Sequence, residues 1–400
     1  MIRERRERFN RAFTAGRYDA MLQRLQGLTG GPVQFHLSET PCFLPHELID
    51  RLIDASQTMV DQLLDDAAYR RAADAIVPPR FRVARAEERP TFVAVDFGLV
   101  DVGGGRLEGR LVELQAFASL FGFQLALGEA CIEAFDLDDV TPLLDGLSRD
   151  EYLGLMRNVL VGSHDPREVV LMEIDPAHQK TWPDFAATER LWDVRAIDVR
   201  DVIKQGRRLW YRRDGELTRI ARVYNRVIPD ELEHKDVALP FDYRDDLDVE
   251  WMGGPDWFFR VSKFGIPWLR HPWVPPAKYL SDVDVAALPA NRDGLLLKPL
   301  FSFAGGGILF APSDADLAAI PADQRHLYLL QERVEFTPVI ETPYGPTKVE
   351  VRIMMVRDGA RYRPVLPLLR MGRGRMMGVS FNKDQAWVGA SAGLLPASRK

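Results

Sequence analysis

Side chains that could bind a nucleotide are concentrated in the last third of the sequence. Lys298 ends an apolar stretch (LLLKPL), and a loop of small residues containing Gly305, Gly306 and Gly307 follows it. Glycine lets backbone N–H groups approach phosphate oxygens without interference from Cβ, and the lysine adds a nearby cation. This order of residues favours phosphate binding, although three glycines in a hairpin also form ordinary turns.

Two later segments could hold the rest of a nucleotide. The segment Gln331–Val334 ends an expected strand over residues 327–334, where main-chain groups can pair with adenine. The carboxylate of Glu332 can accept hydrogen bonds from ribose hydroxyls. The next expected strand (KVEVRIMMV) carries Arg352, whose forked guanidinium suits a phosphate, although an arginine on a strand is more often a surface residue.

Three oxygen-bearing side chains near residue 100 could bind a metal. Asp96 lies in the strand-like run TFVAVDFGLVDV, and Glu113 and Gln115 lie two apart in RLVELQAF, so the latter two face one side of their strand. Residues 103–105 are all glycine and predict a hairpin turn, because a strand and not a helix follows them. Mg²⁺ prefers carboxylate and amide oxygens. The alternative is that these acids are solvated groups on half-buried strands.

The order of lysine, glycine-rich loop, QE segment and E-x-R strand between residues 298 and 352 resembles the ATP-grasp family. The resemblance implies that the ATP phosphates are bound by Lys263, Lys298, Arg352 and the loop of Gly305, Gly306 and Gly307. It also implies that adenine and ribose are held by a linker with Gln331, Glu332 and Val334.

The family places its metal ligands, an acid and an E-x-N pair, on two late strands, and no E-x-N follows Arg352. Asp96 with Glu113-x-Gln115 is similar to that pair, with glutamine in place of the usual asparagine. The chain therefore resembles circularly permuted ATP-grasp proteins of the glutathionylspermidine synthase-like group. The resemblance implies ATP and Mg²⁺ as cofactors and an α/β (α+β) fold in permuted order.

Further polar residues are expected near the reacting groups. Arg370, with Arg373 and Arg375, could stabilise an acyl phosphate and its transition state, and Asn382 could be a polar ligand near phosphate. The alternative is a flexible basic loop.

Asn225 and Arg226 end an expected strand of an open α/β layer, where anionic ligands bind. Arg226 is the expected carboxylate clamp. Its alternative is a salt bridge to Asp230 or Glu231.

The pattern of apolar residues, together with the ATP-grasp resemblance, divides the chain into four expected parts. They are a helical segment over 1–80, a metal-binding half of the permuted fold over 81–160, a Rossmann-like substrate domain over 161–245, and the nucleotide-binding lobes over 246–400. Strand-like runs at 168–173, 194–199 and 220–228, with a helix near 184–192, predict the βαβ units of the third part. No G-x-G-x-x-G follows its first strand, so a nicotinamide cofactor is unsupported.

Composition narrows the class of protein. The 400 residues carry a formal net charge of −6, so bulk electrostatics do not favour nucleic acid. No apolar run approaches the ~18 residues of a membrane span, and the N-terminus has no apolar signal-peptide core, so no membrane partner and a cytoplasmic location are expected. The two cysteines, Cys42 and Cys131, fit no zinc or disulfide pattern.

The expected function is that of an ATP- and Mg²⁺-dependent ligase. It would activate a small-molecule carboxylate as an acyl phosphate for attack by an amine or thiol, releasing ADP and phosphate, with amino-acid or peptide-like substrates. A phosphotransferase and a non-catalytic nucleotide-binding module are the alternatives, because a fold does not fix a reaction.

Overall fold

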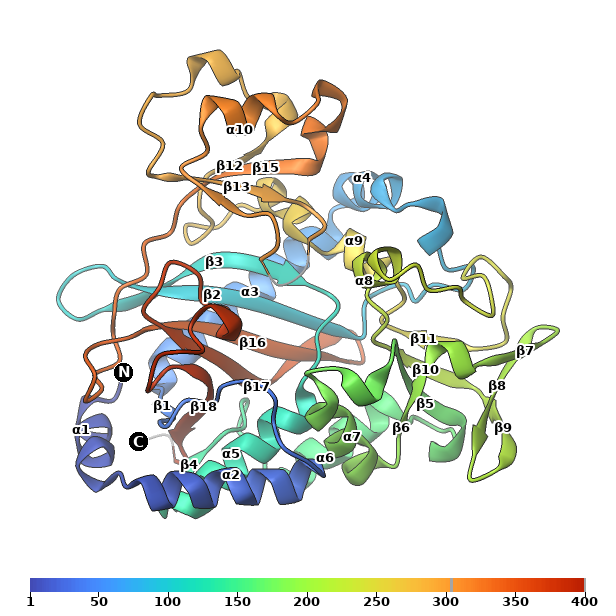
Figure 1. Cartoon of the computed structure of the whole chain (residues 1–400), viewed down its shortest axis with the longest axis horizontal. Helices are drawn as coiled ribbons and strands as arrows, with labels where there is room; N and C mark the ends of the chain where they lie inside the picture. Colours follow the sequence, from blue (N-terminus) through green and yellow to red (C-terminus); the bar gives the residue numbers. More distant parts are fainter. Residues whose placement is uncertain (303–304, 399–400) are drawn as a thin grey trace.

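A large, mostly antiparallel sheet forms the centre of the molecule (Figure 1). The computed structural model describes residues 1–302 and 305–398. The sheet has the strand order β1-β18-β17-β16-β2-β3, and β4 (Val140–Thr141) pairs with β18. Its strands are β1 (Cys42–Phe43), β2 (Phe92–Asp101), β3 (Leu107–Gln115), β16 (Lys348–Asp358), β17 (Arg361–Gly372) and β18 (Gly389–Pro396).

In the centre of this sheet, β2 from the first third of the sequence pairs with β16 from the last third. β2 pairs antiparallel with both β3 and β16, so Asp96 lies opposite Glu113 on one side and opposite Arg352 on the other. The predicted hairpin between β2 and β3 is confirmed, and its three glycines all have positive φ. The strand of Asp96, β2, is therefore the direct neighbour of β16, which carries the expected phosphate-binding arginine, and β3 with the other two expected metal ligands lies on the far side of β2.

Successive side chains of β2 point alternately toward the hydrophobic core on one face of the sheet and toward the opposite face, where Asp96 lies. Val93, Val95 and Phe97 join a buried cluster with helix α3 (His46–Asp65), which covers one face of the sheet. Asp96 projects from the opposite face, because successive side chains on a strand point to opposite sides. Helices α5 (Phe121–Phe135) and α6 (Arg149–Leu160) pack against apolar residues on that opposite face.

A smaller antiparallel sheet stands above the edge of the large one (Figure 1). Its order is β12-β15-β13-β14. Lys298 lies on β13, and the turn with Gly305–Gly307 lies between β13 and β14. The strands are β12 (Ala277–Tyr279), β13 (Leu295–Pro299), β14 (Leu309–Phe310) and β15 (Tyr328–Glu332), with helix α10 (Asp314–Ala318) beside them.

A parallel sheet of order β11-β10-β5-β6 forms a third layer, as the βαβ pattern predicts. Its strands are β5 (Val169–Glu173), β6 (Arg195–Asp198), β10 (Arg222–Asn225) and β11 (Glu250–Met252), with helix α7 (Trp182–Trp192) between β5 and β6. The meander β7 (Ile203–Gln205), β8 (Arg208–Arg213) and β9 (Glu216–Ile220) extends from it. The fold is thus of the mixed α/β class, with separate antiparallel and parallel sheets.

The N-terminal part contributes more than helices. α1 (Arg3–Ala12), α2 (Ala15–Thr29), α3 and α4 (Ala67–Ile76) are helical, but β1 adds a parallel strand beside β18. Within the helical segment expected over 1–80, α3 and α4 are separate helices, because the side chain of Asp66 accepts hydrogen bonds from Ala68 N and Tyr69 N and starts α4. Among the residues described, no helix is both long and apolar enough to cross a bilayer.

Candidate functional site

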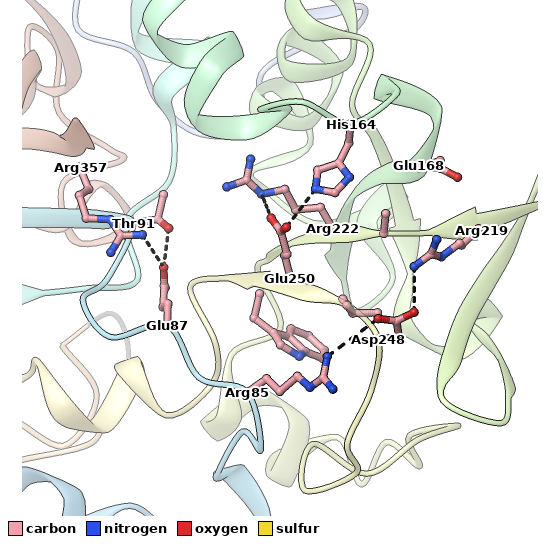
Figure 2. Close-up of a pocket in the computed structure, with 13 residues that line it drawn as sticks. Arg85, Glu87, Thr91, His164, Glu168, Arg219, Arg222, Asp248, Glu250 and Arg357 are labelled. Atoms are coloured by element: carbon pink, nitrogen blue, oxygen red, sulfur yellow. Dashed lines mark hydrogen bonds and ion pairs between the residues drawn. The ribbon is translucent and has the colours of Figure 1, made fainter. Parts of the chain in front are cut away.

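A cavity of about 440 Å³ lies between the segment 85–91 and the first residues of β10 and β11 (Figure 2). Its lining is charged but largely paired: Glu250 lies 3.3 Å from Arg222 Nε and 3.2 Å from His164 Nε2, and Asp248 lies 3.1 Å from Arg219 Nη2. None of the residues expected to do chemistry lines this cavity.

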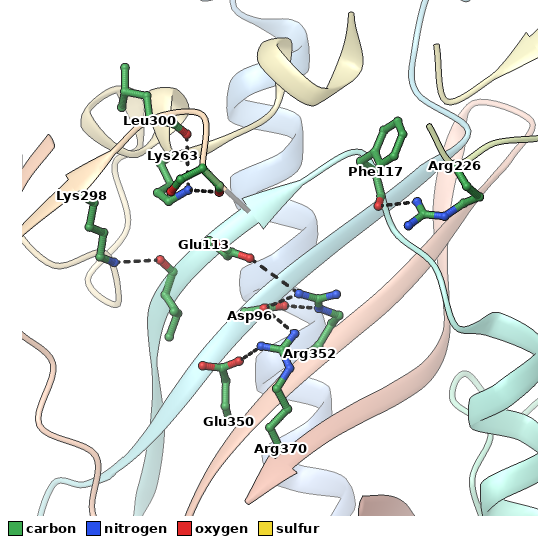
Figure 3. Close-up of polar contacts among 12 residues, drawn as sticks. Asp96, Glu113, Phe117, Arg226, Lys263, Lys298, Leu300, Glu350, Arg352 and Arg370 are labelled. Atoms are coloured by element: carbon green, nitrogen blue, oxygen red, sulfur yellow. Dashed lines mark hydrogen bonds and ion pairs between the residues drawn. The ribbon is translucent and has the colours of Figure 1, made fainter. Parts of the chain in front are cut away.

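Several of the expected residues, among them Asp96, Arg352 and Arg370, lie instead in a buried network of charges on one face of the large sheet (Figure 3). Arg352 binds Asp96 through two parallel hydrogen bonds, Nε to Oδ1 at 2.6 Å and Nη2 to Oδ2 at 2.7 Å. Arg370, on β17, lies 3.5 Å from Asp96 Oδ2 and also donates to Glu350. The network crosses β2, β16 and β17, and Asp96 within it is only 1% exposed.

The three expected metal ligands converge on one cation, which is the guanidinium of Arg352. Glu113 Oε1 lies 3.7 Å from Arg352 Nη2. In the amide orientation that satisfies both of its polar atoms, Gln115 accepts hydrogen bonds from Arg352, with Nη1 at 3.0 Å. Two carboxylates and an amide oxygen suit a hard cation such as Mg²⁺. Within the described residues, however, no group of three or more His, Cys, Asp or Glu side chains is arranged to hold a metal.

Burial and ion pairing act in opposite directions in this network. Burial favours a higher pKa for Asp96, but Arg352 and Arg370 outweigh it and hold that pKa below its usual value. Burial raises the pKa of Glu350 to about 7, against the attraction of Arg370. The Asp96–Arg352 pair is therefore ionised at neutral pH, and Glu350 is protonated more easily than Asp96.

Two buried lysines approach the network from the side of the small sheet (Figure 3). The Nζ atom of Lys298 donates a hydrogen bond to the backbone oxygen of Val112 at 3.4 Å, and Val112 directly precedes Glu113 in the sequence. The Nζ atom of Lys263 donates to the backbone oxygen of Ser302 at 3.0 Å. Neither has an acidic partner within 4 Å in the described chain. Burial lowers the pKa of Lys263 and lowers that of Lys298 to about 8, with Glu113 opposing both shifts. Cations held without close counter-ions are suited to an incoming anion.

The glycine turn and the linker lie at opposite ends of β13: the turn follows Pro299, whereas Gln331 and Glu332 pair with Leu296 and Leu295 at the start of the strand. Gly305 and Gly307 have φ of +76° and +70°, a conformation that favours glycine, and Gly306 lies in the turn between them. The Oε1 atom of Gln331 is buried without a hydrogen-bond partner among the described residues. Glu332 is exposed and Val334 half-buried, and the adenine and ribose contacts expected of this linker remain a prediction.

The alternative expected for Arg226, a salt bridge to Asp230 or Glu231, is absent from the described structure. Arg226 Nη1 donates to Phe117 O at 2.9 Å, in the loop that leaves β3, and its Nε is buried without a partner. Asn225 Nδ2 donates to Gly253 O at 3.0 Å, and its Oδ1 is likewise unpartnered. Both side chains therefore retain capacity for a ligand near the end of β3.

Asn382 lies in a loop after β17. Its oxygen faces the backbone N–H groups of Arg373 (3.3 Å) and Gly374 (3.4 Å), and its nitrogen donates to Met376 O (2.9 Å) and Gly378 O (3.2 Å). These contacts give Asn382 the role of holding its own loop together. The phosphate contact expected of it remains a prediction.

Two acidic residues of this region were not predicted. Glu350 precedes Arg352 by two positions, so alternation along the E-x-R strand places both on one face and could have identified it. Glu173 ends β5 beside Arg226; burial raises the pKa of its carboxyl to about 8, against the attraction of Arg226. The only local feature of the sequence that could have identified Glu173 is its position as an acidic residue at the end of an apolar strand.

No family model matches the sequence, and no curated protein matches it. The structure is similar to that of a glutathione synthetase-like effector from Globodera pallida in its apo form. The TM-score is 0.58 and the sequence identity 10%, over 94% of this chain and 95% of that chain. This likeness shows a common fold over almost the full length of both chains.

Proposed function

We propose that this chain is an ATP-dependent ligase with a circularly permuted ATP-grasp fold. It activates a substrate carboxylate as an acyl phosphate, an amine or thiol attacks that acyl group, and ADP and phosphate leave. One observation carries the proposal: pairing of β2 with β16 brings Asp96 and Arg352, 256 residues apart, into one site. Lys298 of the small sheet and Lys263, neither of which forms a salt bridge with a described residue, approach this site (Figure 3).

The residues of the chain supply binding and electrostatics. Lys263, Lys298 and the glycine turn neutralise and cradle the phosphates, and Arg370 stabilises the charge that develops on the transferred phosphoryl group. Asp96, Glu113 and Gln115 are the residues that would hold Mg²⁺, which neutralises phosphate charge when bound. A carboxylate oxygen of the substrate is the nucleophile, so the protein needs to supply orientation but no covalent group.

Arg226 is the proposed anchor for the substrate carboxylate. Its guanidinium is buried, forms no salt bridge with any described residue, and donates to Phe117 in the loop that follows Gln115, while Glu173 attracts it from a longer distance. Charge-assisted hydrogen bonds to a desolvated guanidinium are among the stronger polar contacts in proteins. We propose small carboxylates and amines of the amino-acid or peptide-like kind as the substrates.

Hydroxylamine trapping tests this function before the acceptor is known. The protein is incubated with Mg·ATP, hydroxylamine and a panel of amino acids and short peptides. A matching carboxylate is expected to yield a hydroxamate and one equivalent each of ADP and phosphate. AMP and pyrophosphate would contradict an acyl phosphate; a stable phosphorylated product without hydroxamate indicates a phosphotransferase, and no turnover despite nucleotide binding indicates a binding module.

Arg226→Met is expected to raise the KM of the carboxylate substrate by roughly 10- to 100-fold, because a hydrogen bond to a charged group contributes about 1.5–3 kcal/mol. Arg222→Met is the matched control, since Arg222 starts the same strand and pairs with Glu250 instead. Initial hydroxamate rates against carboxylate concentration give both KM values. An unchanged KM in a folded Arg226→Met protein would remove Arg226 from the substrate site.

A further inference from the structure

The guanidinium of Arg352 lies between Asp96 and Glu113, two of the expected metal ligands (Figure 3). It donates to both oxygens of Asp96, at 2.6 and 2.7 Å, and lies 3.7 Å from Glu113. In the amide orientation that satisfies Gln115, it also donates to the amide oxygen of that residue. Since these contacts use the oxygens that a metal would need, the nucleotide-free site already contains a cation.

Displacing this guanidinium by a bare metal ion would be costly. Arg352 is buried, with a side-chain exposure of 10%, and Asp96 is buried with it. A metal ion that takes Asp96 leaves Arg352 as an uncompensated buried charge, and removing one partner of a buried ion pair is strongly unfavourable. The pKa of Arg352 is raised, because Asp96 outweighs the effect of burial, so loss of its proton offers no relief.

The net charge of the side chains around the site also disfavours the binding of a bare metal ion. Three carboxylates, Asp96, Glu113 and Glu350, face four cationic side chains: Arg352, Arg370, Lys263 and Lys298. A bare divalent cation adds to this positive excess, whereas a metal–nucleotide complex brings net negative charge. The phosphates of that complex also give Arg352 a new anionic partner at the moment when it leaves Asp96.

We propose that Arg352 is the resident cation of this site and leaves its oxygen ligands only when nucleotide phosphates accept it. The protein then takes up a divalent cation together with nucleotide and has no metal site without it. This inference rests on the proposed function only in taking a nucleotide as the phosphate-bearing ligand. The occupation of the metal ligands by Arg352 in the nucleotide-free protein is inferred from the Arg352 contacts alone.

Equilibrium dialysis with Mn²⁺ tests the proposal, with protein-bound Mn²⁺ as the readout and a non-hydrolysable ATP analogue as the nucleotide. Wild-type protein is expected to retain no Mn²⁺ by itself and one equivalent with the analogue. Arg352→Met, in which an uncharged chain of similar length replaces the cation, is expected to bind Mn²⁺ without nucleotide at least about 10-fold more tightly than wild type. Adding Asp96→Asn to that variant is expected to remove the gained site.

Arg363→Met is the matched control, because Arg363 lies on neighbouring β17 and pairs with Asp145 at 2.7 Å, away from the site. It should gain no Mn²⁺ binding. Nucleotide-independent Mn²⁺ binding by wild type, or a folded Arg352→Met protein that gains none, would overturn the proposal. If Arg352→Met does not fold, the wild-type measurement alone decides. Failure of wild type to bind nucleotide at all would contradict the proposed function instead and leave the gain in Arg352→Met interpretable.

Discussion

Lys298→Met is expected to abolish nucleotide binding while leaving the nucleotide-free protein at least as stable as wild type. The ammonium of Lys298 is buried beside β3 and forms no salt bridge with a described residue, so removing it relieves a desolvated charge. The same removal takes away the cation that we propose binds phosphate. A saturating ligand at ~100 times its Kd stabilises a protein by about 2.7 kcal/mol, and the variant should lose this increment.

Urea unfolding with and without a non-hydrolysable ATP analogue and Mg²⁺ measures both effects. Lys278→Met is the matched control, because Lys278 lies on β12 of the same small sheet and is exposed. It should keep the full response to nucleotide. A Lys298→Met protein that keeps the response would show that the nucleotide does not bind beside β13.

The pKa of Lys298 also makes the stability of the protein and its affinity for nucleotide depend on pH. Its value of about 8 lies below the usual lysine value, so from pH 8 to the unfolded value of about 10.4 the unfolded state binds more protons. This group therefore adds stability to the nucleotide-free protein as pH rises through that window. Nucleotide favours the charged form, so affinity should fall as pH rises above about 8. Lys298→Met should lack both trends.

Asp96→Ala is expected to have the largest effect on stability, a loss of about 3–5 kcal/mol in the free energy of unfolding. The substitution leaves Arg352 without its two short hydrogen bonds and Arg370 with only Glu350, all inside the protein. Urea unfolding at neutral pH gives the value. The double variant Asp96→Ala/Arg352→Met should recover part of the loss, because the uncompensated cation is gone.

Asp145→Ala provides the comparison for an exposed ion pair. Asp145 pairs with Arg363 at a side-chain exposure of 47%, and such pairs contribute about 1 kcal/mol or less. A loss for Asp96→Ala no larger than that of Asp145→Ala would mean that water or movement of the strands compensates the two arginines.

Local pattern determined much of what the sequence predicted. The strands β2, β3, β16 and β17, the hairpin of three glycines, and the shared face of Glu113 and Gln115 follow from alternation and turn chemistry within a few residues. By contrast, α5 was not predicted, because its residues are buried on nearly all sides and show no amphipathic period. Strands β1 and β18 were missed as well, since β1 has two residues and gains its structure only by pairing with β18.

What the sequence determined by itself is therefore the set of chemical groups: two lysines, a glycine turn, three oxygen-bearing side chains and the arginines that accompany them. Only the tertiary structure decided their partners. Whether Asp96 meets a lysine, a metal or Arg352 depends on the register between β2 and β16, which lie far apart in sequence. Periodicity within a strand fixes which side a residue faces, but the free energy that selects its neighbour comes from burying both sheet faces at once, and no local pattern contains that term.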